Sequence, residues 1–222
     1  MKVLIVAAAP VAGSVELVAR LAPQHDLVIA VDGGGAICID AAVMPDIVLG
    51  DFDSLEPAAL EWLRLHGASA LPFPADKDQT DLELALIAAR ERGAREVTVT
   101  AASSGRLDHT LAVVGAIGTA ADLRPQLVEP DLRAWVLGEA GRTELAVAGP
   151  GSILSLVALG AVARVTLSGV RWPLNDRDLP FGSGLGVSNV VTAEAGAVVR
   201  LLAGRLLVLA PDLLGPTRAI TY

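Results

Sequence analysis

Carboxylates, glycines and one arginine gather in four short polar stretches of the sequence, each of which follows an apolar run. These stretches are Asp32-Gly33-Gly34-Gly35, Asp51-Phe52-Asp53, Asp76-Lys77-Asp78-Gln79-Thr80-Asp81 and Ser103-Ser104-Gly105-Arg106-Leu107-Asp108-His109. Carboxylates that share one place repel each other unless a cation joins them, and Mg²⁺ commonly bridges one or two carboxylates to substrate phosphates. Glycines such as Gly33 and Gly34 let backbone amides approach an anion, and Arg106 offers a bidentate fork to a phosphate. The combination predicts a magnesium–polyphosphate site.

Each motif taken alone also has a purely structural explanation. An Asp-x-Asp pair is common in turns, and Asp81 suits the first turn of a helix, where the dipole favours an acid. Gly33 to Gly35 suit a tight turn, and His109 could open a helix. The functional interpretation therefore depends on whether the stretches meet in space.

The elements that must position these residues alternate between strand and helix patterns through the first half of the chain. Strands are predicted at Val3–Ala7, Leu27–Val31, Ile47–Leu49, Ser69–Phe73 and Glu96–Ala101. Helices are predicted at Val15–Leu21 behind a Ser14 cap, at Pro57–Leu65 opened by Ser54, and at Asp81–Arg92 behind a Thr80/Glu83 capping box. Such alternation indicates a largely parallel sheet with helices on both faces. Ligands of open parallel sheets bind beyond the carboxyl ends of the strands, so we expect the four stretches to converge on one crevice.

The second half of the chain loses its helical periodicity after about Leu127. Short strands separated by Gly or Pro are predicted at Leu132–Leu137, Ile153–Leu159, Val162–Leu167, Val190–Thr192, Ala197–Leu202 and Leu206–Leu209. This spacing indicates an antiparallel sandwich or open barrel. We therefore predict an N-terminal α/β domain over residues 1–137 and a C-terminal antiparallel β-sandwich domain over residues 138–222.

Composition excludes several classes of protein. The 222 residues carry a formal net charge of -8, which argues against binding to a nucleic-acid backbone. A hydrophobic fraction of 53% against 19% charged residues excludes intrinsic disorder. The single cysteine, Cys38, makes no internal disulfide, so a reducing cytoplasm is expected. The uncharged segment from Leu145 to Ala163 is interrupted by glycines, which favours two sandwich strands over a membrane-spanning helix.

Well-known phosphate and hydrolase motifs are missing from the sequence. There is no Gly-x-x-x-x-Gly-Lys-Ser/Thr loop and no protein-kinase motif set. The loop around Ser104 also lacks the Gly-x-Ser-x-Gly elbow of α/β-hydrolases. These features exclude P-loop enzymes, protein kinases and α/β-hydrolases.

Five motifs in one order and spacing do match a known family. They are Pro45-Asp46-Ile47-Val48-Leu49-Gly50-Asp51-Phe52-Asp53-Ser54, Asp78-Gln79-Thr80-Asp81-Leu82-Glu83, Gly105-Arg106-Leu107-Asp108-His109, Gly169-Val170-Arg171-Trp172-Pro173-Leu174 and Gly186-Val187-Ser188-Asn189. The chain resembles the thiamin pyrophosphokinases. The resemblance implies transfer of a pyrophosphoryl group from ATP to the thiamin hydroxyl, which gives thiamin diphosphate and AMP, with Mg²⁺ as cofactor. It also implies a homodimer with active sites at the subunit interface. Composition and charge add the expectation of a cytoplasmic protein with neither nucleic acid nor membrane as a partner.

The resemblance also implies roles for individual residues. The catalytic and metal-binding carboxylates would be Asp51, Asp53, Asp78 and Asp81. The residues that bind the nucleotide would be Asp32, Gly33, Gly34, Gln79, Thr80, Ser104, Gly105, Arg106, Asp108 and His109. The thiamin site would contain Trp172, Ser188 and Asn189.

Two departures from the family pattern stand in the motifs. Gly35, Ala36 and Ile37 replace the Ala-Asn-Arg that usually follows Asp-Gly-Gly, and Ser104 replaces a glycine. The alternatives are a Mg²⁺-dependent phosphohydrolase or nucleotide-sugar transferase, and a non-catalytic thiamin- or nucleotide-binding regulatory module. Neither enzyme alternative requires the motif around Trp172, and a regulatory module does not require Asp51, Asp53, Asp78 and Asp81 together.

Overall fold

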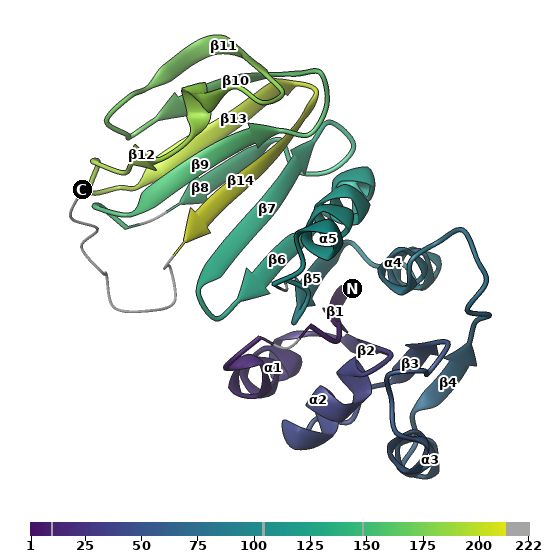
Figure 1. Ribbon diagram of the computed structural model, residues 1–222. Helices are drawn as coiled ribbons and strands as arrows, with labels where there is room; N and C mark the ends of the chain where they lie inside the picture. Colours follow the sequence, from purple (N-terminus) through teal and green to yellow (C-terminus); the bar gives the residue numbers. More distant parts are fainter. Residues whose placement is uncertain (10, 104, 148, 212–222) are drawn as a thin grey trace. The chain divides into compact units, whose positions relative to one another are not determined.

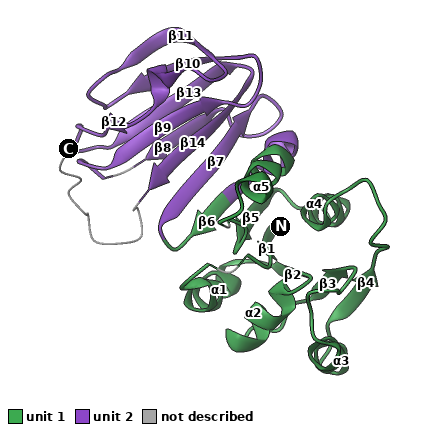
Figure 2. Cartoon of the chain, in the orientation of Figure 1, with its two compact units in different colours: residues 1–116, 127–130 green, residues 117–126, 131–222 purple. Residues whose placement is uncertain are grey.

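The computed structural model describes residues 1–9, 11–103, 105–147 and 149–211. The chain divides into two compact units (Figure 2). The first unit contains residues 1–116 and 127–130, and the second contains residues 117–126 and 131–222. The predicted boundary after residue 137 falls later in the chain than this division, which places the strand at 132–138 in the second unit.

The first unit is an α/β domain, as predicted. Its strands are β1 (Lys2–Val6), β2 (Leu27–Val31), β3 (Ile47–Gly50), β4 (Ser69–Pro72), β5 (Glu96–Thr100) and β6 (Gln126–Glu129). They follow the order β6-β5-β1-β2-β3-β4, and the pairs from β5 to β4 are parallel. Helices α1 (Ser14–Leu21), α2 (Gly34–Asp40) and α3 (Pro57–Leu65) cover one face, and α4 (Asp81–Glu91) and α5 (Leu107–Thr119) cover the other (Figure 1). A short 3₁₀ turn at Ala22–Gln24 follows α1, and the last residues of α5 and a 3₁₀ turn at Ala121–Leu123 belong to the second unit.

The central strands of this sheet are apolar along their whole length because both faces are covered. Leu4 and Val6 of β1 belong to the core beneath the helices α1 to α3, and the intervening Ile5 is equally buried. Continuous burial of this kind is typical of parallel sheets. The apolar sequence patterns of β1, β2, β3 and β5 therefore correctly predicted strands inside a covered parallel sheet.

Helix boundaries agree with the predictions more closely than helix caps do. The Thr80/Glu83 capping box at the start of α4 is confirmed. The predicted caps Ser14 and Ser54 are wrong: Gly13 precedes α1, Glu56 precedes α3, and the Ser54 hydroxyl instead accepts the N–H of Gly33 at 3.0 Å. Pro57 begins α3 and has no N–H to be capped, which removes part of the need for a serine there.

Helix α2 has no counterpart in the sequence prediction, which read Gly33 to Gly35 as a loop. Gly34 lies so close to β1 that a Cβ on it would overlap with the carbonyl oxygen of Val6. A glycine-rich start with poor helix propensity is therefore tolerated because it allows close packing against the sheet. Tertiary packing overrides local propensity at this position.

The second unit is a β-sandwich, also as predicted. One sheet contains β7 (Leu132–Gly138), β9 (Ile153–Ala158), β12 (Asn189–Val190) and β14 (Arg205–Pro211) in the order β12-β9-β14-β7. The other contains β8 (Glu144–Val147), β10 (Val162–Ser168), β11 (Leu174–Pro180) and β13 (Ala197–Ala203) in the order β11-β10-β13-β8. Neighbouring strands within each of these two groups pair antiparallel, and a 3₁₀ turn spans Gly184–Gly186.

The sandwich core comes from alternate residues of facing strands. Leu154 and Leu156 of β9, Val165 and Leu167 of β10, and Leu206 of β14 are almost fully buried in one cluster. The uncharged segment beginning at Leu145 contains β8 and β9, which confirms two strands in place of a membrane-spanning helix. Across the described residues, no helix combines the length and apolarity needed to cross a bilayer. Strand β11 escaped prediction because its middle is polar and exposed.

Two leucines of α3 provide a matched test of this packing. Leu63 is fully buried, whereas Leu65 is 75% exposed on the same helix. We expect Leu63→Ala to lower the free energy of unfolding by about 3 kcal/mol, because it leaves a cavity beneath the sheet. Leu65→Ala should change it by less than about 0.5 kcal/mol. Urea unfolding followed by far-UV circular dichroism measures both, and equal losses would contradict the assigned burial.

Candidate active site

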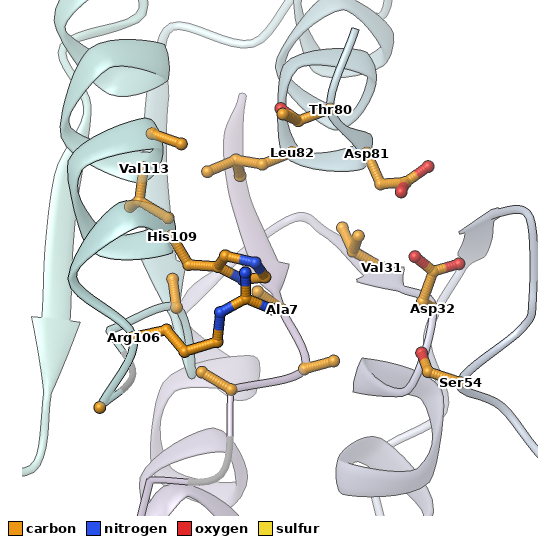
Figure 3. Close-up of a pocket in the computed structure, with 15 residues that line it drawn as sticks. Ala7, Val31, Asp32, Ser54, Thr80, Asp81, Leu82, Arg106, His109 and Val113 are labelled. Carbon is orange, nitrogen blue, oxygen red and sulfur yellow. The ribbon is translucent and has the colours of Figure 1, made fainter. Parts of the chain in front are cut away.

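A pocket of about 660 Å³ opens at the carboxyl ends of the parallel strands in the first unit (Figure 3). It is lined by the residues that follow β1, β2, β3 and β5 and by the start of α4. These residues are Ala7, Ala8, Ala9, Val31, Asp32, Ser54, Thr80, Asp81, Leu82, Ala102, Gly105, Arg106, His109, Ala112 and Val113. Three of the four predicted polar stretches therefore contribute to one crevice, whereas Asp51-Phe52-Asp53 does not line it and is represented there only by the adjacent Ser54.

Two carboxylates, Asp32 and Asp81, lie next to each other on one side of the pocket (Figure 3). Burial, with a smaller contribution from the adjacent carboxylates of Asp81 and Asp51, raises the pKa of Asp32 to about 6. The backbone N–H of Phe52 donates to Oδ1 of Asp32 at 3.1 Å and opposes this shift. Asp32 is therefore a carboxylate held in an electrostatically unfavourable place.

The backbone around Asp32 is shaped to hold it there. Asp32 itself adopts a left-handed conformation with φ 46°. Gly50, at the end of β3, has φ 141°, and a Cβ on it would overlap with the Asp32 carboxylate. Only glycine meets both demands, because it has no Cβ and accepts this φ without strain. The last residue of β3 thus makes the space that the Asp32 side chain occupies.

Helix α4 and the loop before it position Asp81. The Thr80 hydroxyl accepts the N–H of Glu83 at 3.3 Å, and the Glu83 carboxylate accepts the N–H of Thr80 at 2.8 Å. This capping box puts Asp81 in the first helical turn, where the helix dipole favours an anion. The Lys77 ammonium lies 2.9 Å from Oδ1 of Asp81, and that carboxylate raises the pKa of Lys77.

An arginine and a histidine side chain occupy the side of the pocket opposite to the carboxylates of Asp32 and Asp81. Arg106 and His109 point into it from the start of α5 (Figure 3). The Arg106 guanidinium pairs with Asp108 through two contacts, of 2.7 and 3.3 Å, and this partner lowers the pKa of Asp108. Both side chains are about two-thirds exposed, so the pair contributes little stability and Asp108 can be replaced by another anion. The pocket is thus polarised between two acids and a guanidinium.

The donor set fits a divalent cation that also binds a substrate. Within residues 1–9, 11–103, 105–147 and 149–211, no three Asp, Glu, His or Cys side chains form a group that could hold a metal alone. Two neighbouring carboxylates with one raised pKa still suit Mg²⁺, because this ion commonly takes one or two carboxylates and completes its shell with water and phosphate oxygens. The side chains of Asp32 and Asp81 therefore fit a magnesium ion that arrives with a polyphosphate.

Several predicted site residues lie outside the lining of this pocket. Asp51 accepts the N–H of the exposed Asp53 at 3.0 Å, so the Asp-x-Asp motif forms a turn beside Asp32. Asp78 and Gln79 are exposed ahead of α4. Gly33 binds Ser54, and Gly34 packs on β1. Ser104 lies outside the described residues. The roles of all these residues stay predictions.

The predicted thiamin residues belong to the second unit. Trp172 is 54% exposed, and the Arg171 guanidinium lies over its ring at 4.9 Å from the centroid. Asn189 is buried, accepts the N–H of Trp172 at 3.1 Å and donates to its carbonyl at 2.7 Å. The exposed Ser188 has φ 58°, and its N–H donates to the Ser155 hydroxyl at 3.0 Å. Asn189 therefore holds the backbone of Trp172, which presents an aromatic face.

Sequence reasoning missed two groups of residues at the pocket. Lys77, in the loop before α4, does not line the pocket but pairs with the lining residue Asp81, and its position among the acids of the Asp76 to Asp81 stretch is the signal that could have identified it. Ala7, Ala8 and Ala9 line the pocket through their backbone and methyl groups, and nothing in their side-chain chemistry marks them.

Known proteins resemble both units. A family model described as "Thiamin pyrophosphokinase, catalytic domain" matches residues 18–127, and one described as "Thiamin pyrophosphokinase, vitamin B1 binding domain" matches residues 143–206. A thiamine pyrophosphokinase from Bacillus subtilis is 27% identical over 176 residues, which cover 78% of this chain and 82% of that protein. A thiamine pyrophosphokinase from Arabidopsis thaliana is 27% identical over 168 residues, but the match covers only 63% of its length.

Solved structures agree with this relationship. The crystal structure of the Bacillus subtilis thiamine pyrophosphokinase superposes with a TM-score of 0.80 at 24% identity and covers 95% of this chain and 99% of that one. That of Geobacillus thermodenitrificans thiamin pyrophosphokinase gives a TM-score of 0.77 at 26% identity, with 96% and 98% covered. Together the two family models match most of the chain. The first lies largely over the first unit, and the second lies within the second unit. The chain belongs to the thiamin pyrophosphokinase family.

Proposed function

We propose that this protein transfers the pyrophosphoryl group of ATP to the hydroxyl of thiamin. The observation that carries the proposal is the polarised pocket of the first unit, with Asp32 and Asp81 facing Arg106 and His109. A magnesium triphosphate has this distribution of charge: a cation for the acids and phosphate oxygens for the guanidinium. The apolar residues Val31, Leu82 and Val113 line the same pocket and suit the flat base of a nucleotide.

The reaction needs positioning and charge stabilisation more than covalent help from the protein. The thiamin hydroxyl oxygen bonds to the β-phosphorus of ATP, the bond from that phosphorus to the α–β bridging oxygen breaks, and AMP leaves with that oxygen. The hydroxyl proton passes to a carboxylate. Asp81 lines the pocket whereas Asp78 does not, which favours Asp81 over Asp78 as this acceptor. Mg²⁺, when bound, supplies positive charge to the phosphate oxygens.

Thiamin itself suits the second unit. Its thiazolium ring is flat and cationic, and an exposed tryptophan face attracts such a ring through the cation–π interaction. Trp172 offers such a face on a backbone anchored by Asn189. The match of residues 143–206 to a vitamin B1 binding domain supports the same assignment.

The assembly and compartment are further parts of the proposal. We propose a homodimer, as the family resemblance implies; Phe181, Leu185 and Val187, exposed within one short stretch of the second unit, are consistent with an apolar contact there. A cytoplasmic location is supported by Cys38, which is free and buried, and burial raises the pKa of its thiol to about 12. Such a thiol is chemically inert.

The products of the reaction test the proposed function. Incubation with ATP, Mg²⁺ and thiamin should yield thiamin diphosphate and AMP in equal amounts, because one pyrophosphoryl transfer makes one of each. Separation of nucleotides and thiamin esters by chromatography measures both. Omission of thiamin is the control. Formation of ADP or free phosphate, or nucleotide turnover without thiamin, would contradict the proposal and favour a phosphohydrolase.

The stability of the metal-free protein tests the role of Asp32. Its folded-state pKa of about 6 lies above the ordinary value of 3.8, so ionised Asp32 is disfavoured in the folded state. The favourable contribution of protonated Asp32 to the stability of the folded state is fully present below about pH 4, and it is lost as the pH rises through about 6. We expect Asp32→Asn to raise the melting temperature in EDTA at pH 7, and to raise it less at pH 4.5.

Mg²⁺ should make the wild-type protein more stable than Asp32→Asn at pH 7, the reverse of the order in EDTA. The reason is that the ion stabilises the folded state that binds it. Wild-type protein should gain stability from Mg²⁺ at pH 7, and Asp32→Asn should gain less. Asp131→Asn, at an exposed carboxylate, is the matched control and should behave as wild type. An Asp32→Asn variant that responds to Mg²⁺ as wild type does would remove Asp32 from the metal site.

Two tryptophans test the thiamin site. Trp172→Ala should raise KM for thiamin roughly 10- to 30-fold, because it removes the aromatic face, and should leave KM for ATP within about twofold. Trp62→Ala removes an indole that is 41% exposed on α3 of the first unit and is the matched control. Steady-state kinetics with each substrate varied in turn separate the two effects. An unchanged KM for thiamin in Trp172→Ala would rule out this residue as a contact.

A further inference from the structure

Glu129, the last residue of β6, is a fully buried carboxylate that the proposed chemistry does not use. Burial raises its pKa, and the hydrogen bonds it accepts oppose that shift. Desolvation of a charged or polar group is costly unless partners replace the lost water. The identity of those partners shows what the residue does.

Three consecutive backbone N–H groups converge on this one side chain. Oε2 accepts the N–H of Ala101 at 3.2 Å, and Oε1 accepts those of Ala102 at 2.8 Å and Ser103 at 2.9 Å. The Ser103 hydroxyl also donates to the carboxylate. All these donors belong to the segment that leaves β5 and leads to α5. The Glu129 carboxylate therefore replaces the β-sheet and helix partners that this segment lacks.

The same segment contains a strained residue. Ala101 has φ 52°, a left-handed conformation that is unfavourable for a residue with a Cβ. Its N–H is held by Glu129, and its carbonyl accepts the N–H of Ala9 at 2.8 Å. The turn is thus tied on one side to β6 and on the other to the segment after β1, whose residues Ala7 to Ala9 line the pocket. These bonds keep Ala101 in a conformation that it would otherwise leave.

The turn at Ala101 determines where the pocket residues of this segment lie. Ala102 follows immediately, Gly105 and Arg106 stand three and four residues beyond it in the sequence, and all three line the pocket. Glu129 does not line it. We propose that Glu129 is a positioning residue, which fixes the backbone of Ala101, Ala102 and Ser103 and thereby the place where Arg106 meets the nucleotide phosphates. The nucleotide part of this inference rests on the proposed function.

A carboxylate is needed here because it has only acceptors. Glutamine keeps the size of Glu129 but turns one acceptor oxygen into an NH₂ group, which would face a backbone N–H. Glu129→Gln should therefore release at least one of the three amides. Hydrogen exchange of the amides at residues 101–103 should become faster, while exchange in β1 and β2 stays as in wild type.

The kinetic consequence should be selective for the nucleotide. We expect Glu129→Gln to raise KM for ATP roughly tenfold or more, because displacement of a phosphate-binding group by about 1 Å has effects of this order. KM for thiamin should change by less than about twofold. Glu61→Gln is the matched control, since Glu61 is an exposed carboxylate on α3 whose side chain is 62% exposed. Equal changes in both KM values, or no change, would overturn the proposal.

A second substitution separates positioning from general destabilisation. Ala101→Gly removes the Cβ that makes φ 52° costly, so the turn forms more readily without help from the carboxylate. The double variant Glu129→Gln/Ala101→Gly should recover at least part of the wild-type KM for ATP. Absence of any recovery would show that Glu129 does not act through this turn. If Glu129→Gln does not fold, Glu129→Asp, which keeps the charge but shortens the reach, is measured in the same way.

Binding of a non-reactive ATP analogue distinguishes failure of this inference from failure of the proposed function. Calorimetry with the Mg²⁺ complex of the analogue needs no thiamin and no turnover. Wild-type protein that does not bind it would overturn the proposed nucleotide site. Wild-type binding with an unchanged affinity in Glu129→Gln would overturn only the role of Glu129.

Discussion

The half-buried Asp32 carboxylate beside Asp81 is the constraint on which the rest of the first unit depends. Burial and two neighbouring acids raise its pKa, so the folded protein holds the ionised side chain at a cost. The fold meets that cost locally, with a left-handed turn at Asp32, an N–H from Phe52 and a glycine at the end of β3 that leaves room for the carboxylate. Protonation or a bound cation relieves such repulsion, and the second possibility is the basis of the magnesium site that we propose.

The opposite side of the pocket depends on a second buried carboxylate, which bonds to the backbone. There the buried Glu129 carboxylate satisfies three amides of the segment that leads to Arg106. Asp32 thus lines the pocket, whereas Glu129 bonds to the backbone beside it. Both occur at the carboxyl edge of a parallel sheet, where strands end and backbone groups lose their partners. The physical demands of that edge explain why strained residues such as Asp32 and Ala101 gather around the pocket.

The second unit solves a simpler problem. Its two sheets bury alternate residues against each other, and aromatic side chains contribute little to that core. Trp172 is therefore available at the surface, with its backbone bonded to the buried Asn189. The sequence motif that contains Ser188 and Asn189 suggested direct contacts with a ligand. The structure adds a positioning role for Asn189, because its side-chain amide bonds to both the N–H and the carbonyl of Trp172.

What the sequence by itself determined follows from local and periodic patterns. Continuous apolar runs identified β1, β2, β3 and β5, a capping box identified α4, and the position of acids behind strands indicated one crevice. Only the tertiary structure decided that Asp32 and Asp81 become neighbours while Asp53 and Asp78 remain exposed. It alone made Gly34 part of a helix and gave Glu129 its amides. These outcomes depend on close approach between distant segments, and no local pattern encodes the space that a neighbouring strand leaves.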